Sequence, residues 1–267
     1  MNITIIESIK TIANEELKPR FANVDRMTKQ DGSFLTEADL AVQTKVHGLL
    51  STHFPDISFL GEEHDEQMQQ EALKNPNGVW VLDPLDGTSN FSAGIPYYSI
   101  SLALIKAGEV VWGMVYDPER NECFTASTGE GAKLNNEVMI NKPANVEIEK
   151  STAAIDFKRL DGHLASRIAT RPPYSSQRSF GGVALDWCWL AAGRFHIYLH
   201  GKQKLWDYAA GHLVFNEVGG SSCTLAGENV FNFSLQPRSA VAALDEALFT
   251  KWCNYLQIET QRPDNQK

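Results

Sequence analysis

The chain has 267 residues, of which 43% are hydrophobic and 21% charged, a composition typical of a globular enzyme with a sizeable core. Its formal net charge of −9 argues against a general surface for nucleic acid or anionic membrane, because the summed field repels polyanions. No run approaches the roughly 18 apolar residues of a membrane span. The N-terminus lacks a signal-peptide pattern, and the four cysteines are widely spaced, so we expect a cytoplasmic protein.

Two amphipathic helices are predicted near the start of the chain. Isoleucines recur at helical spacing within residues 2–17, which predicts the first helix. Residues 25–35 are polar and contain glycine, so we expect a loop. Thr36 then begins a second helix that runs to Leu50.

Two β-hairpins are predicted after the helices. Residues 98–116 alternate with the period of a strand on both sides of a Lys-Ala-Gly-Glu turn at 106–109. In the second hairpin, residues 129–140, the turn is formed by Asn135 and Asn136.

The second half of the chain is predicted to form a separate lobe. The polar segment 142–152 indicates a connection, and residues 153–220 alternate short apolar runs with helical ones. Residues 239–249, SAVAALDEALF, suggest a final strand and helix. The fold class is therefore mixed α/β, with predicted lobes at 1–145 and 146–267.

Four acidic clusters lie at the edges of apolar runs. They are Thr36-x-x-Asp39, Gly61-Glu62-Glu63, Asp83-Pro84-Leu85-Asp86-Gly87-Thr88 and Trp206-Asp207. Each cluster has an ordinary structural explanation. The first is a capping box, the Asp-Pro and Asp-Gly pairs are turn pairs, Asp207 would be the N-cap of the helix that follows it, and Glu62-Glu63 would be a solvated loop.

Taken together, the clusters indicate a metal site. The segments ISFLGEE and VWVLDPLDG both run from β-type residues into paired acids, so neighbouring strands would bring four carboxylates to one sheet end. Like-charge repulsion and desolvation disfavour such a group unless a cation neutralises it. Oxygen ligands without His or Cys favour Mg²⁺ over Zn²⁺. Pro84 would leave the Leu85 carbonyl free as a further oxygen ligand, and Gly87-Thr88-Ser89 would offer N–H groups and hydroxyls to an anion.

These motifs resemble a known family. WVLDPLDGTSNF, with GEE upstream and WDYAAGHLVFNEVGG downstream, is similar to the inositol monophosphatase family of Mg²⁺-dependent, lithium-sensitive phosphatases. LTEAD, GEGAKLNNE and SFGGVALDWCWLAAGRF are further matches, and the resemblance covers roughly residues 25–220. It implies a layered αβαβα sandwich, a homodimer, inhibition by Li⁺ and two or three Mg²⁺ ions.

The resemblance also implies roles for individual residues. Glu62, Asp83 and the Leu85 carbonyl would hold the first Mg²⁺, and Asp83, Asp86 and Asp207 the second. Thr88 and Asp39 would orient and deprotonate the attacking water, and Glu63 would support the first metal through a water. The residues implied to contact substrate are Leu85, Asp86, Gly87, Thr88, Gly181, Gly182, His200 and Asp207.

The sequence departs from the family pattern at two positions. His200 stands where inositol-selective members carry a glutamate that binds sugar hydroxyls, and Lys202 and Lys204 are close to it. This change favours a more negatively charged substrate or a different polyol, although His200 could also simply line a loop. Thr28 stands where many members have a mobile-loop lysine, a role that Lys29 could take.

A basic stretch precedes the Gly181-Gly182 segment. Its best candidate for a specificity residue is Arg178, and the alternative is a surface loop. Trp187 and Trp189 have helical spacing, which indicates core or a dimer interface.

The leading hypothesis is a Mg²⁺-dependent phosphatase that acts on a small phosphorylated metabolite resembling inositol phosphate. Histidinol phosphate, a sugar bisphosphate and a 3′-phosphonucleotide are alternative substrates within the same fold. A regulatory module that works by protein contact is a hypothesis of another class. The intact set of acids favours catalysis, because a scaffold has no need of mutually repelling carboxylates.

Overall fold

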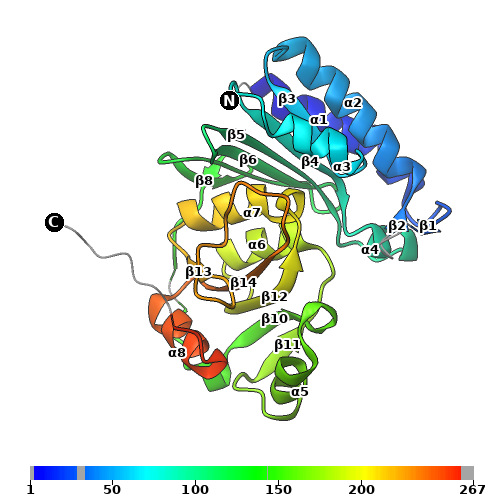
Figure 1. Cartoon of the computed structure of the whole chain (residues 1–267). Coiled ribbons are helices and arrows are strands. Elements are labelled where there is room, and N and C mark those ends of the chain that lie inside the picture. Colours follow the sequence, from blue (N-terminus) through cyan, green and yellow to red (C-terminus); the bar gives the residue numbers. More distant parts are fainter. Residues whose placement is uncertain (1–2, 29–33, 143, 260–267) are drawn as a thin grey trace.

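The computed structural model describes residues 3–28, 34–142 and 144–259, and these form five layers (Figure 1). A helix pair covers a seven-stranded sheet, a second helix pair lies between that sheet and a five-stranded sheet, and a third pair covers the far side. In layer order, the helices are α1 (Ile3–Glu16) and α2 (Glu37–His53), α6 (Val183–Ala191) and α7 (Leu205–Glu217), and α5 (Gly162–Thr170) and α8 (Glu246–Leu256). The αβαβα sandwich expected from the resemblance is confirmed.

The seven-stranded sheet has the strand order β3-β4-β5-β6-β7-β8-β9. Its strands are β3 (Ser58–Gly61), β4 (Val79–Asp86), β5 (Ser99–Lys106), β6 (Glu109–Asp117), β7 (Glu122–Ser127), β8 (Gly131–Leu134) and β9 (Glu137–Val138). β3 and β4 are parallel neighbours, so the predicted convergence of the two acidic strand ends is confirmed. Both predicted hairpins are present, and Asn135 and Asn136 have the positive φ angles that a tight hairpin turn requires.

The five-stranded sheet has the strand order β11-β10-β12-β14-β13. Its strands are β10 (Thr152–Asp156), β11 (Ser176–Arg178), β12 (Ile197–Gln203), β13 (Ser221–Cys223) and β14 (Arg238–Ala243). β10 is parallel to β11 and β12, whereas β14 is antiparallel to β12 and β13. The predicted final strand and helix are β14 and α8.

Several short elements complete the fold. They are β1 (Met27–Thr28), β2 (Phe34–Leu35), α3 (Glu66–Ala72), α4 (Thr88–Ala93) and the 3₁₀ turns η1 (Lys18–Arg20), η2 (Ile148–Lys150) and η3 (Phe157–Arg159). The predicted loop at 25–35 carries the two-stranded ribbon β1–β2 at its ends, and Lys29 lies outside the described residues. No helix in the described ranges is long and apolar enough to cross a membrane.

Three apolar layers separate these elements. Ile5, Ile9 and Trp80 are buried between the first helix pair and the seven-stranded sheet. Trp187 is fully buried in the central layer, which confirms a core position for it. Trp252 is buried in the outer layer, beneath α8.

The predicted boundary between lobes 1–145 and 146–267 falls in the connection between the two sheets, because β9 ends at Val138 and β10 begins at Thr152. α6 and α7 belong to the second lobe, yet they pack against the first sheet and share its apolar layer. The division into two lobes therefore stays a prediction, and the central layer joins them.

We expect Gly113→Ala to lower the free energy of unfolding by about 1–3 kcal/mol, because it overpacks the contact between β6 and α7. A Cβ at Gly113 would lie 2.9 Å from the Cα of Ala210. The matched control is Gly48→Ala on the exposed side of α2, where a Cβ meets nothing within 4 Å. That control should stabilise the protein by about 0.5–1 kcal/mol. Urea unfolding measures both, and unchanged stability of Gly113→Ala would contradict the close packing of α7.

Candidate functional site

A cleft of about 690 Å³ lies between the ends of the two sheets and is the candidate site. Carboxylates come from β4, α6, α7, the end of β10 and the residue after β3, and basic side chains come from η3 and β12. The lining acids predicted from the sequence are Glu62, Asp83, Asp86 and Asp207. The structure therefore brings all four predicted acidic metal ligands to one cleft.

An irregularity in β4 directs two of these acids into the cleft. Residues three apart on a regular strand point to opposite faces. The ladder with β5 pairs Asp83 with Ser101 and Asp86 with Ser99, and its register shifts between them, around Pro84. Proline cannot donate to the ladder, so it suits such a break. Both Asp83 and Asp86 then line the same cleft.

The carboxylate of Asp86 binds the N-terminus of α6. Its two oxygens accept hydrogen bonds from the N–H groups of Val183 (3.0 Å) and Ala184 (2.9 Å), where the helix dipole favours negative charge. A Cβ at Gly182 would lie 3.2 Å from Asp86 Oδ2, which explains a small residue there. The predicted Gly181-Gly182 segment is therefore adjacent to the acids.

Thr88 and Asp39 are in contact, as predicted. Thr88 Oγ1 lies 3.4 Å from Asp39 Oδ1 and 3.0 Å from the Leu85 carbonyl oxygen, to which it donates. Asp39 Oδ2 accepts hydrogen bonds from the N–H and the hydroxyl of Thr36, which complete a capping box for α2. The structural and functional interpretations of Asp39 thus use different oxygens of one carboxylate.

The N-cap interpretation of Asp207 is wrong. α7 begins at Leu205, and Asp207 Oδ2 accepts a hydrogen bond from the N–H of Lys204 at 2.8 Å, so Asp207 is in the first turn of the helix. The helix extends backwards because Leu205 and Trp206 are buried apolar residues. The carboxylate still lines the cleft.

Glu62 and Glu63 are adjacent in the sequence, but only Glu62 lines the cleft. Glu62 continues the pairing of β3 with β4 through its N–H, which donates to the Leu82 carbonyl at 3.0 Å, and it lines the cleft. The N–H of Glu63 donates to Gln43 Oε1 at 3.1 Å, and Glu63 is not one of the described residues that line the cleft. A supporting role for Glu63 stays a prediction.

Burial and mutual repulsion raise the pKa values of the carboxylates. Burial, followed by the charges of Glu62, Asp86 and Asp207, raises the pKa of Asp83 well above its usual range. Burial raises the pKa of Asp86 to about 7 despite the N–H groups it accepts from. Burial and Glu62 also raise the pKa of Asp207. A divalent cation would reverse these shifts, because it favours the ionised forms.

The donor set fits Mg²⁺. All the candidate ligands are oxygens, which hard cations prefer. Within residues 3–28, 34–142 and 144–259, no group of three or more Asp, Glu, His or Cys side chains is already arranged to hold a metal ion. Asp83, Asp86 and Asp207 each have an oxygen engaged by a main-chain N–H. Carbonyl oxygen and water would complete the coordination, as is usual for Mg²⁺.

His200 lies buried at the other side of the cleft, on β12. Its Nε2 is 3.1 Å from Asp156 Oδ2, and its Nδ1 accepts from the N–H of Lys202 at 3.3 Å. Burial raises the pKa of Asp156, but the hydrogen bond and charge of His200, the Lys158 N–H and the charge of Arg159 together lower it. Both ring nitrogens of His200 are therefore used within the protein, and its predicted contact with substrate remains untested.

Two other predicted basic residues lie outside the cleft lining. Arg178 donates through Nη1 to Ser176 Oγ and the Gln177 carbonyl, both at 2.8 Å. Lys204 has its ammonium 5.9 Å from the centre of the Trp206 ring. Neither is one of the described residues that line the cleft, whereas Lys202 is.

Four charged residues that line the cleft were missed in the sequence. Asp186 is buried on α6 and accepts from the Tyr97 hydroxyl at 2.8 Å, and burial raises its pKa well above the usual range. An acid within the apolar run VALDWCWLA was a visible signal. The other three residues are Asp156, Lys158 and Arg159, which follow the apolar strand TAAI.

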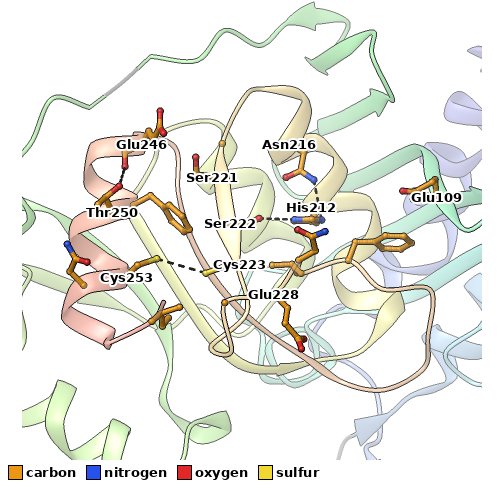
Figure 2. Close-up of a pocket in the computed structure, with 18 residues that line it drawn as sticks. Glu109, His212, Asn216, Ser221, Ser222, Cys223, Glu228, Glu246, Thr250 and Cys253 are labelled. Atoms are coloured by element: carbon orange, nitrogen blue, oxygen red, sulfur yellow. Dashed lines mark hydrogen bonds between the residues drawn. The ribbon is translucent and has the colours of Figure 1, made fainter. Parts of the chain in front are cut away.

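A second pocket of about 610 Å³ lies between α7, β13 and α8 (Figure 2). His212 Nε2 lies 3.0 Å from Ser222 Oγ, and burial lowers the pKa of His212 to about 4. The Cys223 and Cys253 sulfurs are 4.0 Å apart. None of the described residues that line this pocket is Lys or Arg, and none also lines the acidic cleft. The acidic cleft is therefore the stronger candidate for phosphate chemistry.

Comparisons with known proteins agree with this geometry. The family model described as "Inositol monophosphatase family" matches residues 2–261. The chain is 34% identical over 215 residues to Nus factor SuhB of Haemophilus influenzae, covering 78% of each. It is also 34% identical over 203 residues to an inositol-1-monophosphatase of Caulobacter vibrioides, covering 74% of this chain and 78% of the relative. The crystal structure of extragenic suppressor protein suhB from Bartonella henselae matches with a TM-score of 0.80 and 28% identity, covering 96% of this chain and 98% of that one.

We expect Mg²⁺ to raise the melting temperature more at about pH 7.5 than at about pH 5.5, because metal binding requires deprotonated ligands. The raised pKa of Asp86, about 7, gives the folded metal-free protein more bound protons than the unfolded chain. Its free energy of unfolding should therefore fall as the pH rises from about 4 towards 7, and Mg²⁺ should offset that loss.

Thermal unfolding with saturating Mg²⁺ or with EDTA measures this difference at both pH values. Asp86→Asn should reduce the pH dependence, and Glu71→Gln, an exposed acid on α3, should leave it unchanged. Equal Mg²⁺ stabilisation at both pH values would show that these carboxylates do not bind the metal.

Proposed function

Because the chain belongs to the inositol monophosphatase family, we propose that it hydrolyses small phosphomonoesters with Mg²⁺ as its cofactor. The observation that carries the proposal is the convergence of Glu62, Asp83, Asp86 and Asp207 on one cleft, with Thr88 and Asp39 in contact beside them. Buried acids with raised pKa values are typical of functional sites. An αβαβα fold alone would not support this activity.

The proposed metal ligands divide into two sets. Glu62, Asp83 and the Leu85 carbonyl hold one Mg²⁺, and Asp83, Asp86 and Asp207 hold another. When bound, the ions supply positive charge for the phosphate oxygens and lower the pKa of water. Glu63 supports the first set through a water, and the N–H groups of Gly87 and Thr88 bind phosphate oxygens.

Thr88 and Asp39 act on the attacking water. In the structure the Thr88 hydroxyl donates to the Leu85 carbonyl. With that carbonyl engaged by a metal, the hydroxyl would donate instead to Asp39 Oδ1, 3.4 Å away, and would accept a hydrogen bond from the water. Thr36 holds the other Asp39 oxygen at 2.6 Å, so the carboxylate keeps its orientation during proton transfer. The leaving group extends towards Gly181, Gly182 and the side of the cleft that carries His200.

A second candidate function is regulation by protein contact. It is favoured by the 34% identity to a relative named Nus factor SuhB. The two functions are separable, because a variant without metal ligands would lose hydrolysis and keep its surface. The proposed homodimer and Li⁺ sensitivity belong to the phosphatase hypothesis.

We expect Asp83→Asn to lower Mg²⁺-dependent phosphate release from inositol 1-phosphate by about 100-fold or more, because it removes a shared ligand of both metals. Without metal, the variant should melt at the same temperature as the wild type or higher, because a repelling buried charge is gone. Glu66→Gln, an exposed acid on α3, is the control. Full turnover by Asp83→Asn would exclude the proposed metal site.

We also expect Thr88→Ala to lower kcat by about 10²–10⁴-fold, because the hydroxyl that passes the proton to Asp39 is lost. Thr88→Ser keeps the hydroxyl and should retain most of the activity. Steady-state kinetics with inositol 1-phosphate distinguish the two variants. Equal rates for the Ala and Ser variants would rule out the hydroxyl as the group that orients the water.

A further inference from the structure

The candidate cleft has a basic side, formed by Lys158 and Arg159 on η3 and by Lys202 near the end of β12. The four proposed metal ligands come from the seven-stranded sheet and α7, whereas these three basic residues belong to the five-stranded sheet and η3, next to the acid Asp156. On a chain with a net charge of −9, these three basic residues are a local concentration of positive charge within a cleft that is otherwise lined by acids. A neutral leaving group has no negative charge for these side chains to bind.

Asp156 and His200 connect the two segments that carry the basic residues. They are paired in the parallel ladder of β10 and β12, and His200 Nε2 lies 3.1 Å from Asp156 Oδ2. Asp156 Oδ1 also accepts from the N–H of Lys158 at 2.9 Å, and His200 Nδ1 accepts from the N–H of Lys202 at 3.3 Å. We call Asp156 and His200 the brace, because their side chains bind the main chain at both lysines.

Main-chain packing brings the same segments together. A Cβ at Gly201 would lie 1.8 Å from the carbonyl oxygen of Arg159, so only glycine permits this contact between β12 and η3. The register of β12 with β14 shifts between His200 and Gln203, and such bulges redirect side chains next to functional sites. Lys202 lies within this bulge.

The three basic side chains are available to a ligand. Lys158, Arg159 and Lys202 are exposed at the cleft, and none makes a side-chain hydrogen bond or ion pair with another described residue. Guanidinium and ammonium groups recognise phosphate through charge-assisted hydrogen bonds. In the proposed phosphatase, the scissile phosphate lies at the carboxylate side, so these groups face another part of the substrate.

We propose that Lys158, Arg159 and Lys202 form a subsite for a second phosphate on the leaving group, so that the preferred substrates are small bisphosphorylated molecules. This proposal rests on the phosphatase function proposed above and names its substrate class. Asp156 and His200 are positioning residues, because they act through the segments that carry the lysines. Since the subsite is exposed, its contribution should weaken with salt.

The test compares kcat/KM for fructose 1,6-bisphosphate, a probe with a second phosphate, and for inositol 1-phosphate, a probe without one. The wild type should prefer the bisphosphate. The Lys158→Ala/Lys202→Ala double variant should raise KM for the bisphosphate about 10-fold or more, with little change in kcat. Its kinetics with inositol 1-phosphate should stay within about 2-fold of the wild type, because that substrate does not reach the subsite.

The control is Lys133→Ala/Lys150→Ala, which removes the same charge from exposed positions outside the cleft. It should leave both substrates unaffected. An equal loss on both substrates in the cleft variant, or a wild type that prefers inositol 1-phosphate, would overturn the subsite and leave the phosphatase proposal standing. A wild type that releases phosphate from neither probe would overturn both.

The brace has its own test. His200→Leu should raise KM for the bisphosphate by a larger factor than KM for inositol 1-phosphate. His200→Gln, which can still donate to Asp156 from the position of Nε2, should restore part of the preference. A fall in kcat for both substrates in His200→Leu, without restoration by Gln, would show a general structural role instead.

Discussion

The structure depends on holding several carboxylates in one buried place against their mutual repulsion. Main-chain N–H groups do much of this: those of Val183 and Ala184 bind Asp86, and that of Lys204 binds Asp207. These donors lie at the N-termini of α6 and α7, the two helices of the central layer. Packing that layer between the sheets therefore also assembles the acidic side of the cleft.

The cleft is electrically asymmetric, and this asymmetry follows from the layers. The seven-stranded sheet and α7 supply the four proposed metal ligands, whereas the five-stranded sheet and η3 supply Lys158, Arg159 and Lys202. The net charge of −9 for the whole chain does not predict the charge on either side of the cleft. The charge of the whole chain limits its partners, but the field at the site is set by the few groups that the fold brings together.

The sequence predicted features whose cause is local. Two strands that run into paired acids, a capping box at Thr36 and two hairpins can all be read from neighbouring residues, and the structure confirms them. It did not predict that Asp207 lies inside α7 or that Asp156 and His200 pair across a sheet. Those features depend on burial and strand order, and both are determined by contacts between residues far apart in the chain.

Family membership alone does not distinguish catalysis from regulation, because two relatives of equal identity are named Nus factor SuhB and inositol-1-monophosphatase. The free-energy cost of ionising buried carboxylates is a separate argument for catalysis. Burial and neighbouring charges raise the pKa values of Asp83 and Asp207, so their ionised forms are disfavoured in the metal-free fold. A surface used only for protein contact gains nothing from acids placed in this way. The same clustered carboxylates would attract a divalent cation, and the bound cation would attract a phosphate.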